Sequence, residues 1–506
     1  MAVATYDWIA YHAAGHGDTT AVVELATGKS LNYRNFDRRI GRLAAGLRAA
    51  CGIGAGDRVA VLAHNSIDVF EVQFACGRLG AIFVPINWRL TVPELTHIVR
   101  DSAPTVLIYD PEFADAAQEL ARVCTVPHLL GHGPADSDYE CLVATHEALA
   151  ENVPTTHDDI ATIMYTSGTT GHPKGAIITH GMRFWQAINL SIPYRVSAET
   201  VCLTVLPLFH VGGLDVFANP AFHFGGMVLV MRTFDPAECL RVLTDVSLGV
   251  NLFIGVPAHY LFMSQQPAFA SAVFHPKLYA AVGAAPISLT ELRQWEDRGL
   301  ALQQAYGMTE ACGGVMALDP ADSVRKAGSS GKPLLHVAVR LVTPDGREAD
   351  AGEIGEIWMK GPSVTPGYWQ SPAANAASFT DGWLHSGDAA TRDTEGFITI
   401  VDRWKDMYIS GGENVYPAEV EAVLYQLPGI VELAVIGVPD ARWGEVGLAI
   451  VVLKPEAEVT EADIMRHCDG RLARYKQPRL VRFVDALPRN ATGKVHKPTL
   501  RGMFGG

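Results

Sequence analysis

The chain has 506 residues, of which 48% are hydrophobic, and its formal net charge is -14. A chain of this length and apolar content exceeds one hydrophobic core and is not disordered, so we expect a large globular part and a smaller one. The negative balance, with no dense run of Lys and Arg, argues against a nucleic-acid partner.

Short apolar runs alternate with amphipathic stretches through the first part of the chain. An apolar run over 58–62 is followed by an amphipathic stretch over 69–79 and by a second apolar run over 81–85. This alternation predicts α/β units with parallel strands. Further strands are expected at 105–109, 201–206 and 227–231.

The pattern changes twice in the second half. Between 337 and 359 we expect hairpin strands, because Pro344-Asp345-Gly346 and Ala351-Gly352 are turn signals. After Asp402 the apolar runs 433–438 and 448–453 form a new strand set with its own helices. The sequence therefore predicts two domains, 1–402 and 403–506.

The segment 164–175 reads MYTSGTTGHPKG and lies between two apolar runs. Its glycines, hydroxyl residues and Lys174 suit a loop that holds phosphate, because backbone N–H groups and hydroxyls donate and the lysine supplies charge. It is not a Walker A loop, since the GxxxxGK[ST] spacing is missing. The alternative is an ordinary surface loop between strands, rich in Gly, Ser and Thr.

Five further motifs follow in chain order. They read QAYGMTE at 304–310, HSGD at 385–388, VDRWKD at 401–406, ISGGENVYPAEVE at 409–421 and PRNATGK at 488–494. With the segment 164–175, this series resembles the adenylate-forming superfamily, which includes acyl- and aryl-CoA synthetases, firefly luciferase and the adenylation domains of peptide synthetases. The resemblance spans nearly the whole chain, from Leu31 to Leu500.

The resemblance implies a fold and a reaction. The fold is a large N-terminal domain with parallel α/β sheets and a small β-barrel-like part, followed by a small mobile α+β domain. The reaction converts a carboxylic acid and ATP to an acyl-adenylate and pyrophosphate, then passes the acyl group to coenzyme A. In-line attack at the α-phosphate brings two anions together, so it needs positive charge, hydrogen-bond donors and Mg²⁺ on the leaving phosphates.

The resemblance also assigns roles in nucleotide binding. The β- and γ-phosphates would be held by Thr166, Ser167, Gly168, Thr169, Thr170, Gly171 and Lys174. Thr309 would contact the α-phosphate, and Glu310 with Thr169 would bind Mg²⁺. The adenine would lie against Gly283, Ala284, Ala285, Tyr306, Gly307 and Met308, and the ribose against Asp388 and Arg403. Read alone, Glu310 is a helix cap, Asp388 a turn residue, and Arg403 with Asp402 a surface ion pair.

Two parts of the C-terminal domain would act in turn. Lys494 is by itself a solvated lysine, but in the family it reaches between the carboxylate and the α-phosphate. For the second step the domain would rotate about a hinge, which matches Lys405, and present Gly411, Gly412 and Glu413 to the pantetheine arm. The other interpretation of this loop is a glycine turn that ends a strand.

The acid pocket would be lined, by resemblance, by 206–215, 253–259, 282–285 and 311–315. No arginine lies in these segments, which argues against dicarboxylates and amino acids and favours a hydrophobic monocarboxylate. The pairs Gly212-Gly213 and Gly313-Gly314 leave room for an aryl ring or an alkyl chain. His210 resembles the gating residue beside the carboxylate; alone, it is a core histidine. The chain is similar both to bacterial feruloyl-CoA synthetases and to medium- or long-chain fatty-acyl-CoA synthetases.

We therefore expect an enzyme that uses ATP, Mg²⁺ and coenzyme A, and a homodimer is common in such enzymes. The alternatives are an adenylating enzyme that loads a carrier protein and a non-catalytic nucleotide-binding protein. The chain ends shortly after Lys494 without a carrier domain, which favours coenzyme A, and Lys174, Glu310, Asp388 and Lys494 are all present.

The sequence also predicts a cytoplasmic protein. The eight cysteines lack metal-ligand spacing, the N-terminus lacks a signal-peptide pattern, and the apolar runs are shorter than the roughly 20 residues that cross a bilayer. A peripheral membrane contact stays open.

Overall fold

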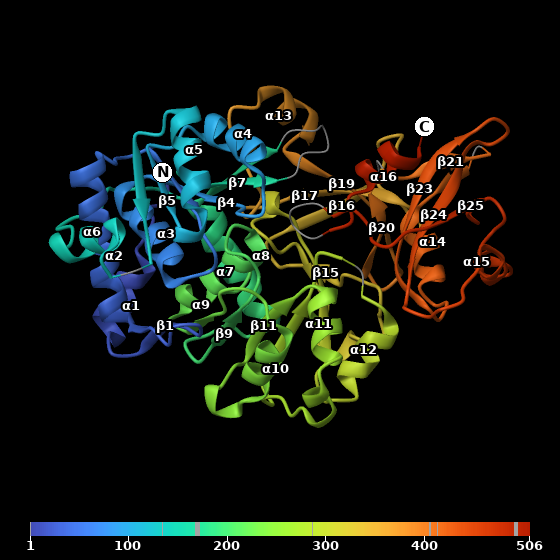
Figure 1. Cartoon of the computed structure of the whole chain (residues 1–506), viewed down its shortest axis with the longest axis horizontal. Helices are drawn as coiled ribbons and strands as arrows, with labels where there is room; N and C mark the ends of the chain where they lie inside the picture. Colours follow the sequence, from blue (N-terminus) through green and yellow to red (C-terminus); the bar gives the residue numbers. More distant parts are fainter. Residues whose placement is uncertain are drawn as a thin grey trace. The chain divides into compact units, whose positions relative to one another are not determined.

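The computed structural model describes residues 2–133, 135–166, 173–285, 287–403, 406–411, 413–489 and 494–505, with only the backbone at Asn414. They form two compact units (Figure 1). The first unit is Met1–Ala338 with Lys360–Leu384, and the second is Val339–Met359 with His385–Gly506. The domain boundary after Asp402, which is expected because a new set of strands and helices begins there, stays a prediction.

The first unit contains a six-stranded sheet in the order β6-β5-β3-β4-β7-β8. Neighbouring strands are parallel except for β7 and β8, which form an antiparallel hairpin. The strands expected at 58–62, 81–85 and 105–109 are confirmed as β3, β4 and β5. The bounds are β3 (Arg58–Leu62), β4 (Ile82–Ile86), β5 (Val106–Tyr109), β6 (His128–Gly131), β7 (Ile160–Thr166) and β8 (Lys174–Thr179).

A nine-stranded sheet completes this unit, in the order β15-β14-β13-β12-β11-β9-β10-β1-β2. The strands from β13 to β1 in this order are parallel to their neighbours, and the pairs at both ends are antiparallel. The bounds are β1 (Thr20–Glu24), β2 (Ser30–Asn32), β9 (Val201–Thr204), β10 (Met227–Val230), β11 (Leu252–Gly255), β12 (Tyr279–Val282), β13 (Leu302–Tyr306), β14 (Met316–Ala317) and β15 (Lys332–Pro333).

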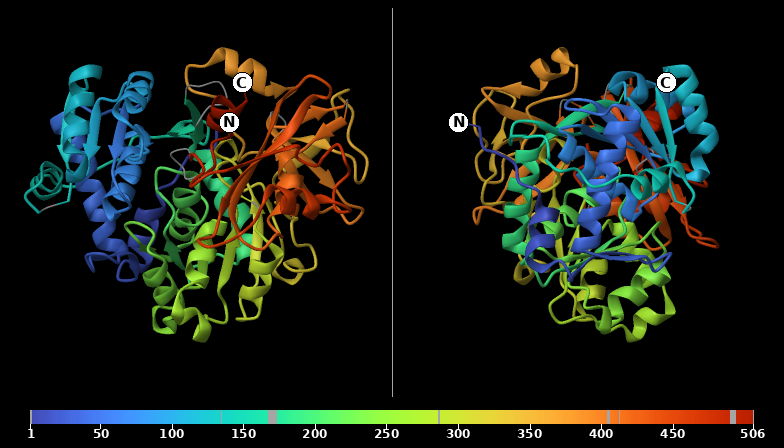
Figure 2. Two further views of the ribbon diagram at one scale, coloured as in Figure 1. Left: turned by 45° about the vertical axis from the view of Figure 1, so that its right-hand side comes forward. Right: turned by 90° about the vertical axis from the view of Figure 1, so that its left-hand side faces the viewer.

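Helices connect these strands, as the alternating pattern predicts. The predicted amphipathic stretch 69–79 is helix α3 (Ile67–Leu79). Helix α11 (Pro257–Ser264) packs against α10 (Pro236–Thr244) and α12 (Leu289–Glu296), which are green to yellow in Figures 1 and 2. The others described in this unit are α1 (Trp8–His16), α2 (Tyr33–Cys51), α4 (Val92–Ser102), α5 (Ala114–Cys124), α6 (Asp138–Thr145), α7 (His180–Tyr194), α8 (Val211–Leu214), α9 (Ala218–Phe224) and α13 (Pro372–Ser378).

The cores explain why these segments form strands. Every residue of β4 is buried, because a parallel strand covered by helices on both faces has no solvent side. In the core beside the nine-stranded sheet, the rings of Trp295 and Tyr260 pack edge to face, with their centroids 5.1 Å apart. The sequence also sets helix ends: α3 stops where Gly80 adopts a positive φ of 64°.

The second unit contains two further sheets. One includes β16 (Ala338–Val342), β17 (Gly355–Lys360), β19 (Trp383–Arg392) and β20 (Ile398–Arg403), which confirms the hairpin strands expected between 337 and 359; the short β18 (Phe379–Thr380) pairs with the start of β19. The other holds the strands expected at 433–438 and 448–453, which are longer than predicted. It consists of β21 (Tyr408–Ser410), β22 (Glu413–Val415), β23 (Ile430–Asp440), β24 (Gly444–Leu453) and β25 (Leu480–Phe483).

Among the described residues of the second unit, the helices are α14 (Pro417–Leu424), α15 (Glu461–Cys468) and α16 (Lys497–Phe504). Short 3-10 turns complete the described chain, at η1 (Pro111–Phe113), η2 (Val246–Leu248), η3 (Pro267–Ser271), η4 (Thr309–Ala311) and η5 (Pro320–Asp322). Within the described ranges, no helix has the length and apolar character needed to cross a membrane.

Candidate active site

The predicted site residues of the first unit follow the carboxyl ends of its parallel strands. Thr166 ends β7, the loop that begins with Gly283 follows β12, Tyr306 ends β13, and His210 lies beyond β9. Open parallel sheets bind ligands at this edge. The fold therefore gathers segments that lie far apart in the sequence.

The hairpin of β7 and β8 carries the predicted phosphate loop. Thr166 and Lys174 are paired in register across its last rung, and the Thr166 hydroxyl lies 3.4 Å from the Lys174 carbonyl oxygen. No carboxylate of a described residue pairs with the Lys174 ammonium. The predicted phosphate contacts of Ser167, Gly168, Thr169, Thr170 and Gly171 lie outside the described residues, as does the predicted metal ligand Thr169.

The segment after β13 is tightly packed. A methyl group in place of the Gly307 Cα hydrogen would lie 1.4 Å from the Gly313 carbonyl oxygen, so only glycine fits there. Met308 precedes the 3-10 turn η4, which begins at Thr309. Thr309 and Glu310 are buried, at 5% and 7% exposure. The cap positions of this turn are Met308 and Cys312, so Glu310 does not cap it.

Glu310 accepts a hydrogen bond at Oε1 from the Tyr368 hydroxyl, at 2.9 Å, and its backbone carbonyl accepts from the amide of Thr365 at 2.7 Å. Mg²⁺ prefers oxygen ligands and takes one or two carboxylates together with phosphate oxygens. The Glu310 carboxylate, with the hydroxyl-rich loop after Thr166, has the donor chemistry for this ion. Sequence reasoning missed Tyr368, whose partner lies 58 positions away.

The predicted adenine loop has an unusual backbone. Ala284 has a positive φ of 69°, which costs a non-glycine residue conformational energy. Both Ala284 and Ala285 are exposed, and the amide of Gly283 donates to the Gly255 carbonyl at 3.3 Å. Val282 and Gln304 pair across β12 and β13, so this loop and Tyr306 leave the sheet at the same edge.

His210 begins helix α8 as its N-cap. Its Nδ1 accepts from the backbone N–H of Gly212 at 3.1 Å, so the neutral ring carries its proton on Nε2. The side chain of Asn65 fixes the segment that precedes His210. It donates to the carbonyls of Leu206 and Met231 and accepts from the amide of Leu208. Asn65 is a second residue that sequence reasoning missed.

Close packing explains two glycines of the predicted pairs, Gly213 and Gly313, and the expectation that the pairs leave room for the acid stays a prediction. A methyl group at Gly213 would come within 2.4 Å of the carbonyl oxygens of Leu206 and Pro207. At Gly313 it would come within 2.6 Å of Val216, and φ there is +111°. Glycine therefore allows close packing against backbone at Gly213 and against a side chain at Gly313.

An arginine does lie beside one predicted pocket segment. The guanidinium carbon of Arg89 is 4.3 Å from the Trp88 ring centroid and 5.5 Å from that of Phe209. No carboxylate of a described residue pairs with this group, and burial lowers its pKa. Burial, reinforced by Arg89, also lowers the pKa of His259 to about 4, so His259 is neutral at pH 7. The lack of arginine within the pocket segments therefore does not exclude acids with a second anionic group, because Arg89 lies beside one of these segments.

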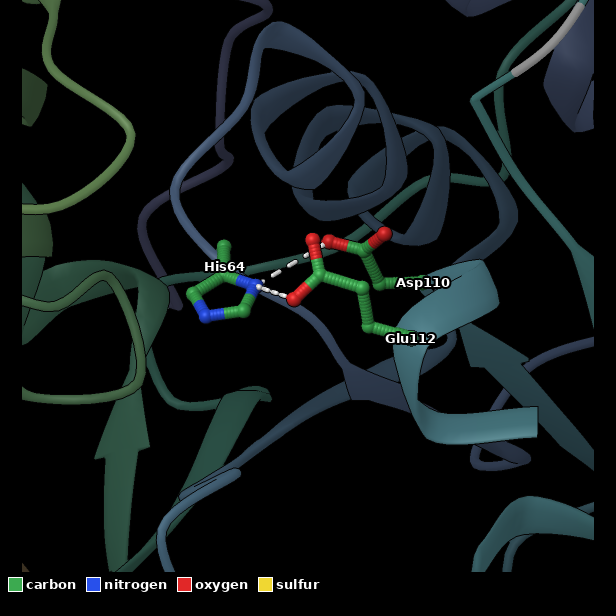
Figure 3. Close-up of side chains that lie close together, drawn as sticks. All are labelled: His64, Asp110 and Glu112. Atoms are coloured by element: carbon green, nitrogen blue, oxygen red, sulfur yellow. Dashed lines mark hydrogen bonds and ion pairs between the residues drawn. The ribbon is translucent and has the colours of Figure 1, made fainter. Parts of the chain in front are cut away.

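One cluster of the described residues has ligand atoms close enough to hold a metal: His64, Asp110 and Glu112 (Figure 3). Nδ1 of His64 lies 3.4 Å from Asp110 and 3.7 Å from Glu112. However, the guanidinium of Arg232 donates to both carboxylates, at 2.7 Å and 2.8 Å. A guanidinium already pairs with both carboxylates, so we interpret the cluster as an ion-pair network.

The second unit brings together the predicted ribose-binding residues. Asp388 and Arg403 pair across β19 and β20, and Arg403 Nε lies 3.3 Å from Asp388 Oδ1. Asp402 instead accepts from the Ala418 amide in the first turn of α14, at 2.7 Å. The surface pair of Arg403 with Asp402 is therefore not found.

Lys494 interacts electrostatically with this pair. Partial loss of hydration lowers its pKa although the residue as a whole is exposed; Arg403 lowers it further, and Asp388 acts in the opposite direction. Lys494 therefore interacts with the two predicted ribose-binding residues, Arg403 and Asp388, which an isolated surface lysine would not do.

The predicted pantetheine loop is the turn between β21 and β22, where Ser410 pairs with Glu413. Gly411 has a positive φ of 63°, and a methyl group there would come within 2.8 Å of the Trp443 ring. Glu413 is exposed. At Gly411 the backbone fits the glycine-turn interpretation. Gly412 and the predicted hinge Lys405 lie outside the described residues.

Comparisons with known proteins agree with this arrangement. The sequence pattern described as AMP-binding enzyme matches residues 9–369, and that of the AMP-binding enzyme C-terminal domain matches 419–494. A feruloyl-CoA synthase of Amycolatopsis sp is 43% identical over 480 residues, 94% of this chain and 95% of that protein. The long-chain-fatty-acid–CoA ligase FadD13 of Mycobacterium tuberculosis is 38% identical over 96% of this chain and 95% of that protein. ATP-bound MatB from Rhodopseudomonas palustris has a TM-score of 0.90 at 32% identity, with 98% of each chain covered.

Proposed function

Because the chain belongs to the family of AMP-binding enzymes, we propose that it is an ATP-dependent acid–CoA ligase. It joins a carboxylic acid to AMP, releases pyrophosphate and transfers the acyl group to coenzyme A. One structural observation carries the proposal: Lys174, which no described carboxylate neutralises, and the buried carboxylate of Glu310 contact the same side chain, Tyr368. A cation and a carboxylate held together at a strand edge suit a magnesium–triphosphate ligand.

In the first step the first unit binds the nucleotide. Lys174 and the loop after Thr166 hold the β- and γ-phosphates, and Thr309 donates to the α-phosphate. Glu310 and Thr169 would hold Mg²⁺, which would supply positive charge for the departing phosphates. The adenine lies between Tyr306 and the loop that begins with Gly283.

Residues of the second unit complete this step. Asp388 accepts from the ribose hydroxyls, and Arg403 fixes the Asp388 carboxylate through their 3.3 Å ion pair. The ammonium of Lys494 stabilises the charge that develops between the attacking carboxylate and the α-phosphate. We also propose that the C-terminal domain begins after Asp402 and rotates about a hinge at Lys405.

The acid substrate is a hydrophobic carboxylic acid, and we propose an aryl acid of the hydroxycinnamate type before a fatty acid. Support comes from the higher identity to the feruloyl-CoA synthase, 43% against 38% for the fatty-acid ligase. His210 presents an Nε2 proton, which suits donation to a carboxylate. In the second step Gly411, Gly412 and Glu413 line the path of the pantetheine thiol.

The test uses purified protein with Mg²⁺, ATP and coenzyme A, and either ferulate or a straight-chain acid such as octanoate or palmitate. We expect AMP and the acyl-CoA thioester, with the highest kcat/KM for ferulate. Higher kcat/KM for palmitate would contradict the aryl assignment and keep the ligase. An adenylate that forms without transfer to coenzyme A would favour the carrier-loading alternative.

A further inference from the structure

Tyr368 lies in the segment between β17 and α13 and contacts two parts of the proposed ATP site. Its hydroxyl donates to Glu310 Oε1 at 2.9 Å. The ammonium of Lys174 lies 5.4 Å from the centroid of its ring. The tyrosine itself is buried, at 9% exposure. A single side chain thus connects the turn that carries Glu310 with the strand that begins at Lys174.

The backbone around Tyr368 is held independently of its hydroxyl. Tyr368 forms an antiparallel bridge with Ala176, and the amide of Trp369 donates to the Gly175 carbonyl at 2.7 Å. On the other side, the amide of Thr365 donates to the carbonyl of Glu310 at 2.7 Å. The segment therefore stays attached to both β8 and η4 when the hydroxyl is removed, so a Tyr368→Phe variant is expected to fold.

The two contacts have different physical effects. A hydrogen bond to one carboxylate oxygen restricts the rotation of Glu310 and orients the carboxylate toward a bound cation, and such supporting bonds typically change metal affinity by about 10- to 100-fold. The ring attracts the Lys174 ammonium by a cation–π interaction. A carboxylate in the same place would neutralise the lysine, whereas the ring leaves its full charge available for phosphate.

We propose that Tyr368 is a positioning residue that orders Glu310 for Mg²⁺ through its hydroxyl and holds Lys174 for the phosphates through its ring. This inference rests on the proposed function, because it takes Glu310 and Lys174 as ATP-site residues. A purely structural role is the competing explanation, since Tyr368 also packs against Ala176 and Ala374.

The two effects are separable by binding measurements that need no turnover. Isothermal titration calorimetry gives the affinity for ATP with Mg²⁺ and, in EDTA, without it. Tyr368→Phe keeps the ring and removes the hydroxyl, so we expect Mg²⁺–ATP affinity to fall about ten-fold and metal-free ATP affinity to stay unchanged. Tyr368→Leu removes both contacts, so metal-free ATP affinity should fall as well.

The chain offers a matched control in Tyr139, a buried phenol on α6 that donates to Glu71 at 2.7 Å. Helix α6 carries none of the proposed site residues, so Tyr139→Phe should bind ATP like the wild type with and without Mg²⁺. Wild-type affinity of Tyr368→Phe for Mg²⁺–ATP would overturn the inference and leave the proposed function standing. An equal loss with and without Mg²⁺ would assign Tyr368 a structural role. Failure of the wild type itself to bind Mg²⁺–ATP would overturn both.

Discussion

A buried ion pair beside His210 gives a prediction whose size follows from the structure. Arg183 on α7 donates through Nε to Asp215 at 2.8 Å and through its terminal nitrogen to the Thr162 hydroxyl on β7 at 2.7 Å. Asn219 donates to the same Asp215 oxygen at 2.7 Å. Asp215 is 1% exposed and ends the short helix that His210 begins. The pair thus ties the histidine segment to the strand that leads to the phosphate loop.

Removing one partner leaves the other as an uncompensated buried charge, which costs about 3–5 kcal/mol. We expect Asp215→Ala and Arg183→Met each to lower the free energy of unfolding by about 4 kcal/mol. At ~2.1 cal/mol/K per residue, this lowers Tm by roughly 5 °C for a unit of this size. In the double variant, the loss in free energy of unfolding should be about 2–3 kcal/mol smaller than the sum of the two single losses. The reason is that the second change removes a charge that the first has already left unpaired.

Thermal melts followed by circular dichroism supply the four values of this double-mutant cycle. The matched control is the pair of Arg241 with Glu238, which has the same kind of bond at 2.7 Å but is exposed. Glu238→Ala should change stability by less than about 1 kcal/mol. Additive losses at Arg183 and Asp215, or losses no larger than that of the control, would refute the reasoning from burial.

Three further predictions concern catalysis and pH. Lys494→Ala should reduce acid-dependent pyrophosphate exchange by about 10² to 10³ and spare transfer from supplied acyl-adenylate to coenzyme A, whereas equal loss in both assays would make the lysine structural. Burial lowers the pKa of His180, His223 and His259 from 6.5 to about 4, so the unfolded chain takes up protons first as pH falls from 6.5 toward 4. Stability should drop in that window by up to about 1.4 kcal/mol per pH unit for each histidine, and a Tm equal at pH 7 and pH 5 would contradict this. Lys405→Pro fixes φ at the predicted hinge, so it should keep pyrophosphate exchange and lose transfer to coenzyme A; parallel losses in a folded protein would exclude Lys405 as the pivot.

Strands are predicted correctly where a continuous apolar run marks a buried parallel strand. The apolar run at 58–62 is β3, because a buried parallel strand has no polar face to obscure the signal. In the second unit, β23 extends beyond its predicted range to Pro439 and Asp440. These residues are poor strand formers, and their extended conformation comes from pairing with Glu445 and Gly444 on β24.

The parts of the site that sequence reasoning missed depend on contacts distant in the chain. Asn65 binds a segment 141 positions away, and no local pattern around it indicates that partner. Arg89 follows β4 at the carboxyl edge of its sheet, and only the fold places it over Phe209. Gly213 shows another limit: glycine composition does not distinguish open space from close backbone packing, and Gly213 packs closely against the carbonyl oxygens of Leu206 and Pro207.

The central claim is that this chain forms an acyl-adenylate and passes its acyl group to coenzyme A. The most direct measurement identifies the nucleotide product by chromatography after incubation with Mg²⁺, ATP, ferulate and coenzyme A. The account predicts AMP and pyrophosphate, formed with feruloyl-CoA in equal amounts and only when the acid is present. Formation of ADP and phosphate, or thioester without AMP, would contradict it.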